Sequence, residues 1–249
     1  MTPPRIRIGC AGWSLPRQER ANFPSEGSQL ERYASRLSVV EIDSFFYRPH
    51  RLETYIRWAA TTPSDFRFSV KLQKAITHES RLVGTMPALD EFLSQVAGLG
   101  AKLGCLLVQL PPSFAFDRQR FRRFAAGLRE RHDGPVAIEP RHASWFDARA
   151  DELLARFEFA RVLADPVLHA NAAAPGGWPG LVYLRLHGSP RRYWSSYPDS
   201  LLRQLASRLV LAQEDGVPCW CVFDNTASGA AVGNALALER MLNSPSRMA

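Results

Sequence analysis

The chain has 249 residues, of which 46% are hydrophobic and 22% charged, as is usual for a globular protein. No apolar run approaches the ~20 residues that span a membrane. The first residues lead directly into a strand-like segment without the apolar region of a signal peptide, so we expect a cytoplasmic protein with no membrane partner. The net charge of +7 favours an anionic partner. However, the densest arginine cluster, residues 118–124, lies on a predicted amphipathic helix, where a solvated charged face is the usual explanation.

Short apolar segments alternate with helical stretches along the whole chain. Strands are expected at residues 5–10, 39–43, 66–72, 103–110, 135–139, 160–164, 181–186 and 217–223. Helices are expected at about residues 29–37, 51–61, 87 onward, 117–131, 148–157, 166–174, 198–214 and 228–242, the stretch at 166–174 being the weakest. No linker or change of composition divides the chain. The pattern therefore predicts an α/β fold, a single (β/α)8 TIM-type barrel with parallel strands that forms one domain over residues 1–249.

Polar residues follow six of these strands at their carboxyl ends. Because the chemistry of a closed α/β barrel takes place where its strands end, we expect these residues to converge on one pocket. Alternate side chains of a strand point to opposite faces, which identifies the side chains that point into the barrel. The expected interior set is Glu41, Asp43, Ser69, Lys71, Gln109, Glu139, Arg141, Arg185 and His187, with Asp224 or Asn225 from the last strand.

Buried charges are costly unless they pair, so we expect Glu41 or Glu139 to face Arg185 or Arg141. Two roles remain open for this set. The deeper residues can form a structural ion-pair layer inside the barrel. The residues at the strand ends are better placed to face a ligand, because stability alone does not call for polar groups at the mouth.

Seven motifs, in their order along the chain, resemble the DUF72 (YecE-like) family. They are GCAGW (9–13), VEIDSFFYRP (40–49), DFRFSVKLQKAITH (65–78), LGCLLVQLPPSF (103–114), AIEPRHASW (137–145), YLRLHG (183–188) and FDNTASGAAVGNA (223–235). The resemblance implies a TIM-type barrel, but little about activity, since the family is named for an unknown function. The chain departs from the family's usual residues at Asp43 and Asp224, where Asn is usual, and at Pro140, where Phe is usual. The two carboxylates make the expected pocket more acidic.

We expect an enzyme, a hydrolase or lyase, that binds a small anionic or phosphate-containing molecule in this pocket. The predicted catalytic residues are Glu139, His187 and Asp43, since carboxylates and imidazole exchange protons with substrates. An arginine fork and a lysine suit an anion. The predicted substrate-binding residues are Lys71, Gln109, Arg141, His142, Arg185, Asn225, Trp13 and Tyr47.

Other functions also fit the sequence. No cofactor is predicted; a divalent metal is less favoured, because no ligand spacing motif is present and Lys71, Arg141 and Arg185 would repel it. Arginines interleaved with aromatic residues at 191–197 suit nucleic-acid binding, with a metal-dependent endonuclease-like activity as the enzymatic form. The chain can also be a non-catalytic ligand-binding protein. The sequence does not indicate an oligomeric state.

Overall fold

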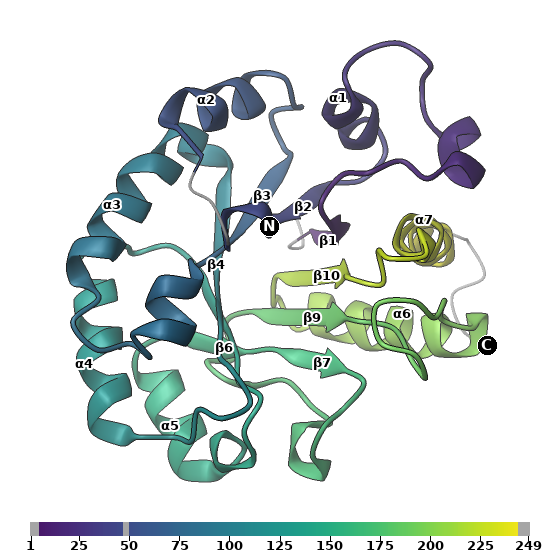
Figure 1. Cartoon of the computed structure of the whole chain (residues 1–249). Coiled ribbons are helices and arrows are strands. Elements are labelled where there is room, and N and C mark those ends of the chain that lie inside the picture. Colours follow the sequence, from purple (N-terminus) through teal and green to yellow (C-terminus); the bar gives the residue numbers. More distant parts are fainter. Residues whose placement is uncertain (1–4, 47–49, 244–249) are drawn as a thin grey trace.

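The computed structural model describes residues 5–46 and 50–243, so the predicted site residue Tyr47 lies outside the described residues. The strands lie at the centre, with the helices from α2 (Leu52–Ala60) to α5 (Ala148–Arg156) on one outer side and α6 (Asp199–Glu214) and α7 (Ala230–Asn243) on another (Figure 1). The described strands belong to one sheet in the order β7-β9-β10-β1-β2-β3-β4-β5-β6-β8. Their bounds are β1 Ile6–Ala11, β2 Val39–Ile42, β3 Arg67–Lys71, β4 Leu103–Gln109, β5 Val136–Glu139, β6 Phe159–Arg161, β7 Leu163–Asp165, β8 Gly176–Gly177, β9 Val182–Leu186 and β10 Cys219–Phe223.

The parallel α/β barrel is confirmed, but the prediction of eight uninterrupted strands is wrong, because the described residues form ten. The expected sixth strand is split at Val162. Its first part, β6, pairs with β5, and its second part, β7, pairs with β9. The N–H of Val162 still bonds the carbonyl of Ile138 at 2.9 Å, and Leu163 already pairs with Leu184. This one stretch joins the two ends of the sheet, so the barrel is nearly closed.

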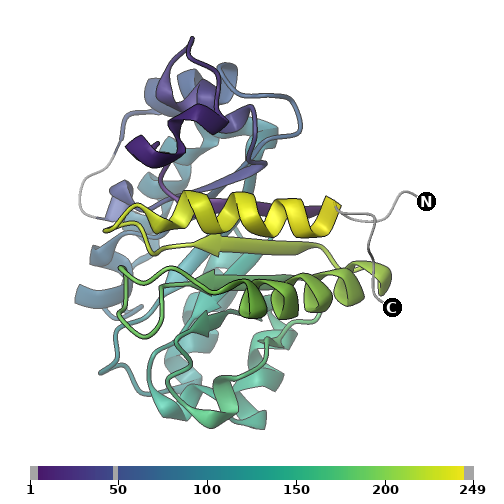
Figure 2. The same cartoon turned by 90° about the vertical axis from the view of Figure 1, so that its right-hand side faces the viewer.

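Seven α-helices cover the described part of the barrel. They are α1 Gln29–Ala34, α2 Leu52–Ala60, α3 Met86–Val96, α4 Arg118–Arg129, α5 Ala148–Arg156, α6 Asp199–Glu214 and α7 Ala230–Asn243. The turned view shows α6 and α7 lying side by side against the barrel (Figure 2). None of the helices in the described residues is long and apolar enough to cross a membrane.

The weak helix expected at 166–174 is not formed. This stretch contains only a 3-10 turn at Ala170–Ala172, followed by β8, which pairs antiparallel with β6. Residues 169–180 are rich in Ala, Gly and Pro and offer no apolar stripe that a helix could bury against the barrel.

The barrel has an apolar lower interior and a polar upper interior. A buried cluster inside the strands includes Val39, Cys105, Leu107, Ala137 and Tyr183. On the same strands, Glu41, Gln109, Glu139 and Arg185 follow two residues later toward the carboxyl ends. Because side chains on one face of a strand recur every two residues, the polar side chains lie directly above the apolar cluster inside the barrel.

Candidate functional site

Arg185 of β9 lies at the centre of the polar interior and is almost completely buried. Its Nε donates to Glu41 Oε1 at 2.8 Å and its Nη1 to Glu139 Oε2 at 3.1 Å. Its Nη2 contacts Asp43 Oδ2 at 2.9 Å and Asp224 Oδ2 at 3.1 Å. The expected pairing of Glu41 and Glu139 with arginine is confirmed. Since carboxylates surround all three nitrogens, Arg185 belongs to an ion-pair layer and offers no free N–H to a substrate anion.

Glu41 is the deepest carboxyl group of this layer. The Tyr183 hydroxyl donates to Glu41 Oε2 at 2.8 Å and lies 2.9 Å from Ser69 Oγ. Burial raises the pKa of Glu41 to about 8, and the negative charge of Asp43 adds to this, while Arg185 acts in the opposite direction. The folded barrel therefore favours the protonated form of Glu41 more than the unfolded chain does.

His187 links two further carboxylates. Its Nδ1 lies 2.8 Å from Asp224 Oδ2, and its Nε2 lies 3.0 Å from Glu139 Oε1 and 2.8 Å from Arg141 Nη2. The ring donates to Glu139 through Nε2 when protonated there, and accepts from Arg141 when it is not. Arg141 also forms an ion pair with Glu139 Oε1. Asp224, His187, Glu139 and Arg141 thus form one buried chain of hydrogen bonds.

The two carboxylates next to His187 stay ionised at neutral pH. Burial alone would raise the pKa of Glu139, but Arg141, Arg185 and His187 outweigh it and hold the pKa well below its ordinary value. Burial also acts to raise the pKa of Asp224, and there Arg185 and His187 outweigh it.

A cleft of about 350 Å³ opens at the carboxyl ends of β1, β2 and β10. Its walls carry one indole, hydroxyl groups and carboxylates, from Trp13, Ser14, Ser44, Thr226, Glu41, Asp43 and Asp224. The Asp43 side chain is 30% exposed and that of Asp224 11%. The side chains of Glu139 and His187 are at most 1% exposed. Asp43 and Asp224 can therefore touch a substrate in the cleft, whereas the predicted catalytic residues Glu139 and His187 lie behind them.

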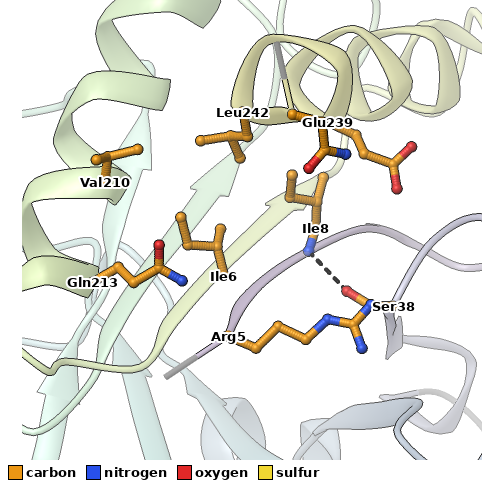
Figure 3. Close-up of a pocket in the computed structure, with 9 residues that line it drawn as sticks. Arg5, Ile6, Ile8, Ser38, Val210, Gln213, Glu239 and Leu242 are labelled. Carbon is orange, nitrogen blue, oxygen red and sulfur yellow. Dashed lines mark hydrogen bonds between the residues drawn. The ribbon is translucent and has the colours of Figure 1, made fainter. Parts of the chain in front are cut away.

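A second cavity, of about 230 Å³, lies between β1, α6 and α7, away from the polar interior. Ile6, Ile8, Val210 and Leu242 point toward it, and the N–H of Ile8 bonds Ser38 Oγ at 3.3 Å (Figure 3). The lining residues include no hydrogen-bonded acid–base pair among the described contacts, so this cavity is not the candidate site.

The other predicted residues divide into two groups. Lys71, Gln109, Arg141 and Trp13 lie at the expected end of the barrel. Lys71 Nζ is 3.8 Å from Asp43 Oδ2 and 4.2 Å from the centre of the Phe46 ring. Gln109 Nε2 donates to Glu139 Oε2 at 3.1 Å, and Trp13 lines the cleft.

His142 and Asn225 have other contacts. His142 Nδ1 lies 2.9 Å from Ser144 Oγ and accepts the Ser144 N–H, which caps the 3-10 turn Ala143–Trp145. Asn225 Nδ2 donates to the Ser195 carbonyl at 2.9 Å and to Asn234 Oδ1 at 2.8 Å. The described contacts therefore join neither side chain to the ion-pair layer.

Sequence reasoning missed the hydroxyl groups of the cleft, those of Ser14, Ser44 and Thr226. Ser44 follows Asp43 directly and Thr226 lies two residues after Asp224. Extending each polar strand end by two or three residues would have found them.

No group of three or more His, Cys, Asp or Glu side chains in the described residues has the geometry of a metal site. The carboxylates converge on the guanidinium of Arg185, which occupies the position that a dication would need. A metal at this point would have to displace a fully paired, buried cation.

A family model described as "Protein of unknown function DUF72" matches residues 7–248. The chain belongs to the DUF72 family. It is 33% identical to the UPF0759 protein YecE of Escherichia coli K12 over 109 residues, which are 44% of this chain and 39% of that protein. It is 24% identical to the UPF0759 protein YunF of Bacillus subtilis 168, over 96% of this chain and 95% of YunF. The predicted family is confirmed.

Solved structures of DUF72 proteins share the fold. A DUF72 family protein of Enterococcus faecalis V583 has a TM-score of 0.80 at 24% identity and covers 98% of this chain and 100% of its own. One from Thermotoga maritima MSB8 has a TM-score of 0.78 at 24% identity, with 96% and 99% covered. A xylose isomerase-like TIM barrel/4-hydroxyphenylpyruvate dioxygenase fusion protein matches at 0.53 and 13% identity, over 96% of this chain and 42% of its own. These likenesses concern the fold alone.

Proposed function

We propose that this DUF72 protein is an enzyme that performs general acid–base chemistry on a small polar substrate carrying an anionic group. The observation that carries the proposal is that Asp43 and Asp224 both border the cleft and both contact Nη2 of Arg185. One buried guanidinium thus fixes two carboxylates at the wall of one cavity. Preorganised acid–base groups of this kind are what proton transfer to a bound substrate requires.

The two sides of the cleft differ in protonation. Asp224, whose pKa is lowered by Arg185 and His187 against the effect of burial, is the base. Glu41 contacts the same guanidinium, and burial raises its pKa to about 8. We assign Glu41 as the proton donor, since neighbouring carboxyl groups with separated pKa values divide the acid and base roles. His187 orients Asp224 and is a positioning residue.

The hydroxyl groups and carboxylates of the cleft suit hydroxyl groups of a ligand, and Trp13 offers an apolar face. The anionic group of the substrate needs cations outside this lining. Lys71 and Arg141 are the predicted cations at the mouth, because Arg185 is already fully paired.

A panel of phosphate esters and hydroxy acids, both classes carrying hydroxyl groups, tests this function. At least one compound should raise the melting temperature, since a ligand at 100 times its Kd adds about 2.7 kcal/mol of stability. Asp224→Asn should keep binding and lose turnover at least a hundredfold, the scale of a general base. Asp215→Asn, on the exposed end of α6, is the control. Binding without turnover by the wild type would indicate a ligand-binding protein, and full activity of Asp224→Asn would exclude the proposed base.

Nucleic-acid processing is the second candidate function, favoured by one observation. The Arg191 guanidinium lies 4.4 Å from the centre of the Trp194 ring, and Trp194 is 45% exposed. Such a pair suits base stacking and phosphate contact. Binding to a single-stranded oligonucleotide should then weaken steeply with salt and with Trp194→Ala. An absence of binding at low salt contradicts this candidate.

A further inference from the structure

The loop between β9 and α6, residues 187–198, holds two arginines over aromatic rings instead of over carboxylates. Arg191 lies over Trp194, and the Arg192 guanidinium lies 5.0 Å from the centre of the Tyr193 ring. Among the described residues, neither guanidinium pairs with a carboxylate or donates a hydrogen bond to the protein. Arg192 Nε is shielded from solvent and has no acceptor. A buried donor without an acceptor is costly, and a ligand can supply the acceptor.

A chain of contacts links Arg192 to Arg141. Arg141 contacts His187, and the His187 and Tyr193 rings meet edge to face at 5.7 Å. The Arg192 guanidinium in turn lies over the Tyr193 ring. Burial lowers the pKa of Arg141, Glu139 counteracts this, and the positive charge of Arg192 lowers it further. Arg141 Nε is also shielded and without an acceptor. Each of these two arginines thus keeps one shielded Nε–H without an acceptor, and the charge of Arg192 acts on Arg141.

The backbone holds Arg192 and Tyr193 in place. Tyr193 has a φ of +66°, a region that a non-glycine residue enters at a cost. Its N–H donates to the His187 carbonyl at 2.5 Å, and its carbonyl accepts the Ala227 N–H at 3.0 Å. Ser228 Oγ bonds the Trp194 carbonyl at 2.5 Å. Strain of about 1–3 kcal/mol persists only where the surroundings enforce it, and it concentrates at ligand sites.

We propose that Arg141 and Arg192 form a subsite for a phosphate group of the substrate, with Tyr193 as the residue that positions Arg192. This rests on the proposed function and names its substrate class, a phosphate ester whose hydroxylated part occupies the carboxylate-lined cleft. Two neighbouring guanidinium groups repel each other until an anion lies between them, and their forks match phosphate oxygens. Lys71 is less suited, since Asp43 and the Phe46 ring already hold it.

Inorganic phosphate is the probe, titrated calorimetrically into the full chain with chloride adjusted to constant ionic strength. The wild type should bind it, and Arg192→Met should bind it at least tenfold more weakly. Arg192→Lys, which keeps the charge but not the fork, should fall between them. Arg203→Met, on the exposed face of α6, removes the same charge elsewhere and should bind like the wild type.

Three outcomes overturn the subsite: no phosphate binding by the wild type, equal weakening in Arg192→Met and Arg203→Met, or tighter binding of acetate than of phosphate. None of them concerns Asp43 or Asp224. If the wild type then turns over a hydroxylated compound and Asp224→Asn does not, the proposed function stands although the phosphate subsite is overturned. Phosphate binding with no turnover of any ester would support the subsite and contradict the enzyme.

Discussion

Arg185 pairs with four carboxylates at once, and this contact set determines how the interior can be charged. A buried ion pair gains little over an apolar core, because both charges lose their hydration. The removal of one partner is far more costly, since the other charges then stay buried without compensation. Asp43 and Asp224 both contact the Nη2 group of Arg185.

Arg185→Met should lower the free energy of unfolding by about 3–5 kcal/mol at neutral pH, the cost of breaking a buried pair. Glu139 and Asp224 would face each other around His187 without the guanidinium. Arg185→Lys keeps the charge but loses the forked guanidinium, so its free energy of unfolding should lie between those of the wild type and Arg185→Met. Urea unfolding measures all three, with Arg203→Met as a surface control expected within about 0.5 kcal/mol of the wild type. A loss below 1 kcal/mol for Arg185→Met would mean that the carboxylates are neutral without it.

The interior residues could be predicted because side-chain alternation is local. Tyr183 and Arg185 share a face because they are two residues apart on β9, and Asp43 continues the face of Glu41 one residue past the end of β2. Just past the last strand, the sequence left Asp224 and Asn225 as alternatives. Asp224 enters the ion-pair layer whereas Asn225 turns to Ser195. Trp220 and Val222 lie in the interior cluster, so Asp224 continues the alternation of β10 and Asn225 does not.

The order of the elements could also be predicted, unlike the places where a strand changes neighbour. Residues 159–165 have the apolar character of one strand, yet pair first with β5 and then with β9. Closure of the barrel imposes this change, and closure is a property of all the strands together. The stretch after β7 lacks an apolar stripe, so no helix forms there, although the strand–helix alternation predicts one at this place.

The loop at residues 187–198 depends on Asn234 of α7. Asn234 Oδ1 accepts from the Tyr197 N–H at 3.2 Å and from Asn225 Nδ2 at 2.8 Å, and its Nδ2 donates to the Tyr197 carbonyl at 3.2 Å. Asn234→Ala leaves these buried groups unsatisfied and should cost about 1–3 kcal/mol.

Hydrogen exchange checks this anchor locally. Peptides covering residues 189–198 should exchange faster in Asn234→Ala by a larger factor than peptides from β3 and β4, whose acceleration is limited to the loss of global stability. Gln204→Ala, on the exposed face of α6, is the matched control. Unchanged exchange in the loop would show that its backbone bonds to His187 and Ala227 hold it without Asn234.

The molecule carries a net charge of +7, but its interior is close to balance. The carboxyl groups of Glu41, Asp43, Glu139 and Asp224 face the cations Lys71, Arg141 and Arg185 across the upper barrel. The basic excess therefore lies outside this cluster. Because the interior carboxyl groups titrate differently in the folded and unfolded chains, the stability of the whole barrel depends on pH.

Glu41 makes the folded chain less stable as the pH rises, whereas Glu139 and Asp224 make it more stable. The pKa of Glu41 rises from 4.5 in the unfolded chain to about 8 in the folded one, so the folded state holds a proton that the unfolded state releases. This contribution is complete below pH 4.5 and is lost as the pH rises toward 8. The pKa values of Glu139 and Asp224 are lowered, so their contribution is present above their ordinary values, 4.5 and 3.8, and is lost as the pH falls below them.

Stability should therefore be highest near pH 5 and decline on both sides. Glu41→Gln cannot release a proton and should abolish most of the decline between pH 5 and pH 8, while it keeps the acid limb set by Glu139 and Asp224. Urea unfolding from pH 3 to pH 9 measures both limbs, with Glu214→Gln on the exposed end of α6 as the control. Parallel curves for the wild type and Glu41→Gln between pH 5 and pH 8 would show that Arg185 keeps Glu41 ionised in the folded barrel. The proton donor of the proposed reaction would then have to lie elsewhere in the cleft.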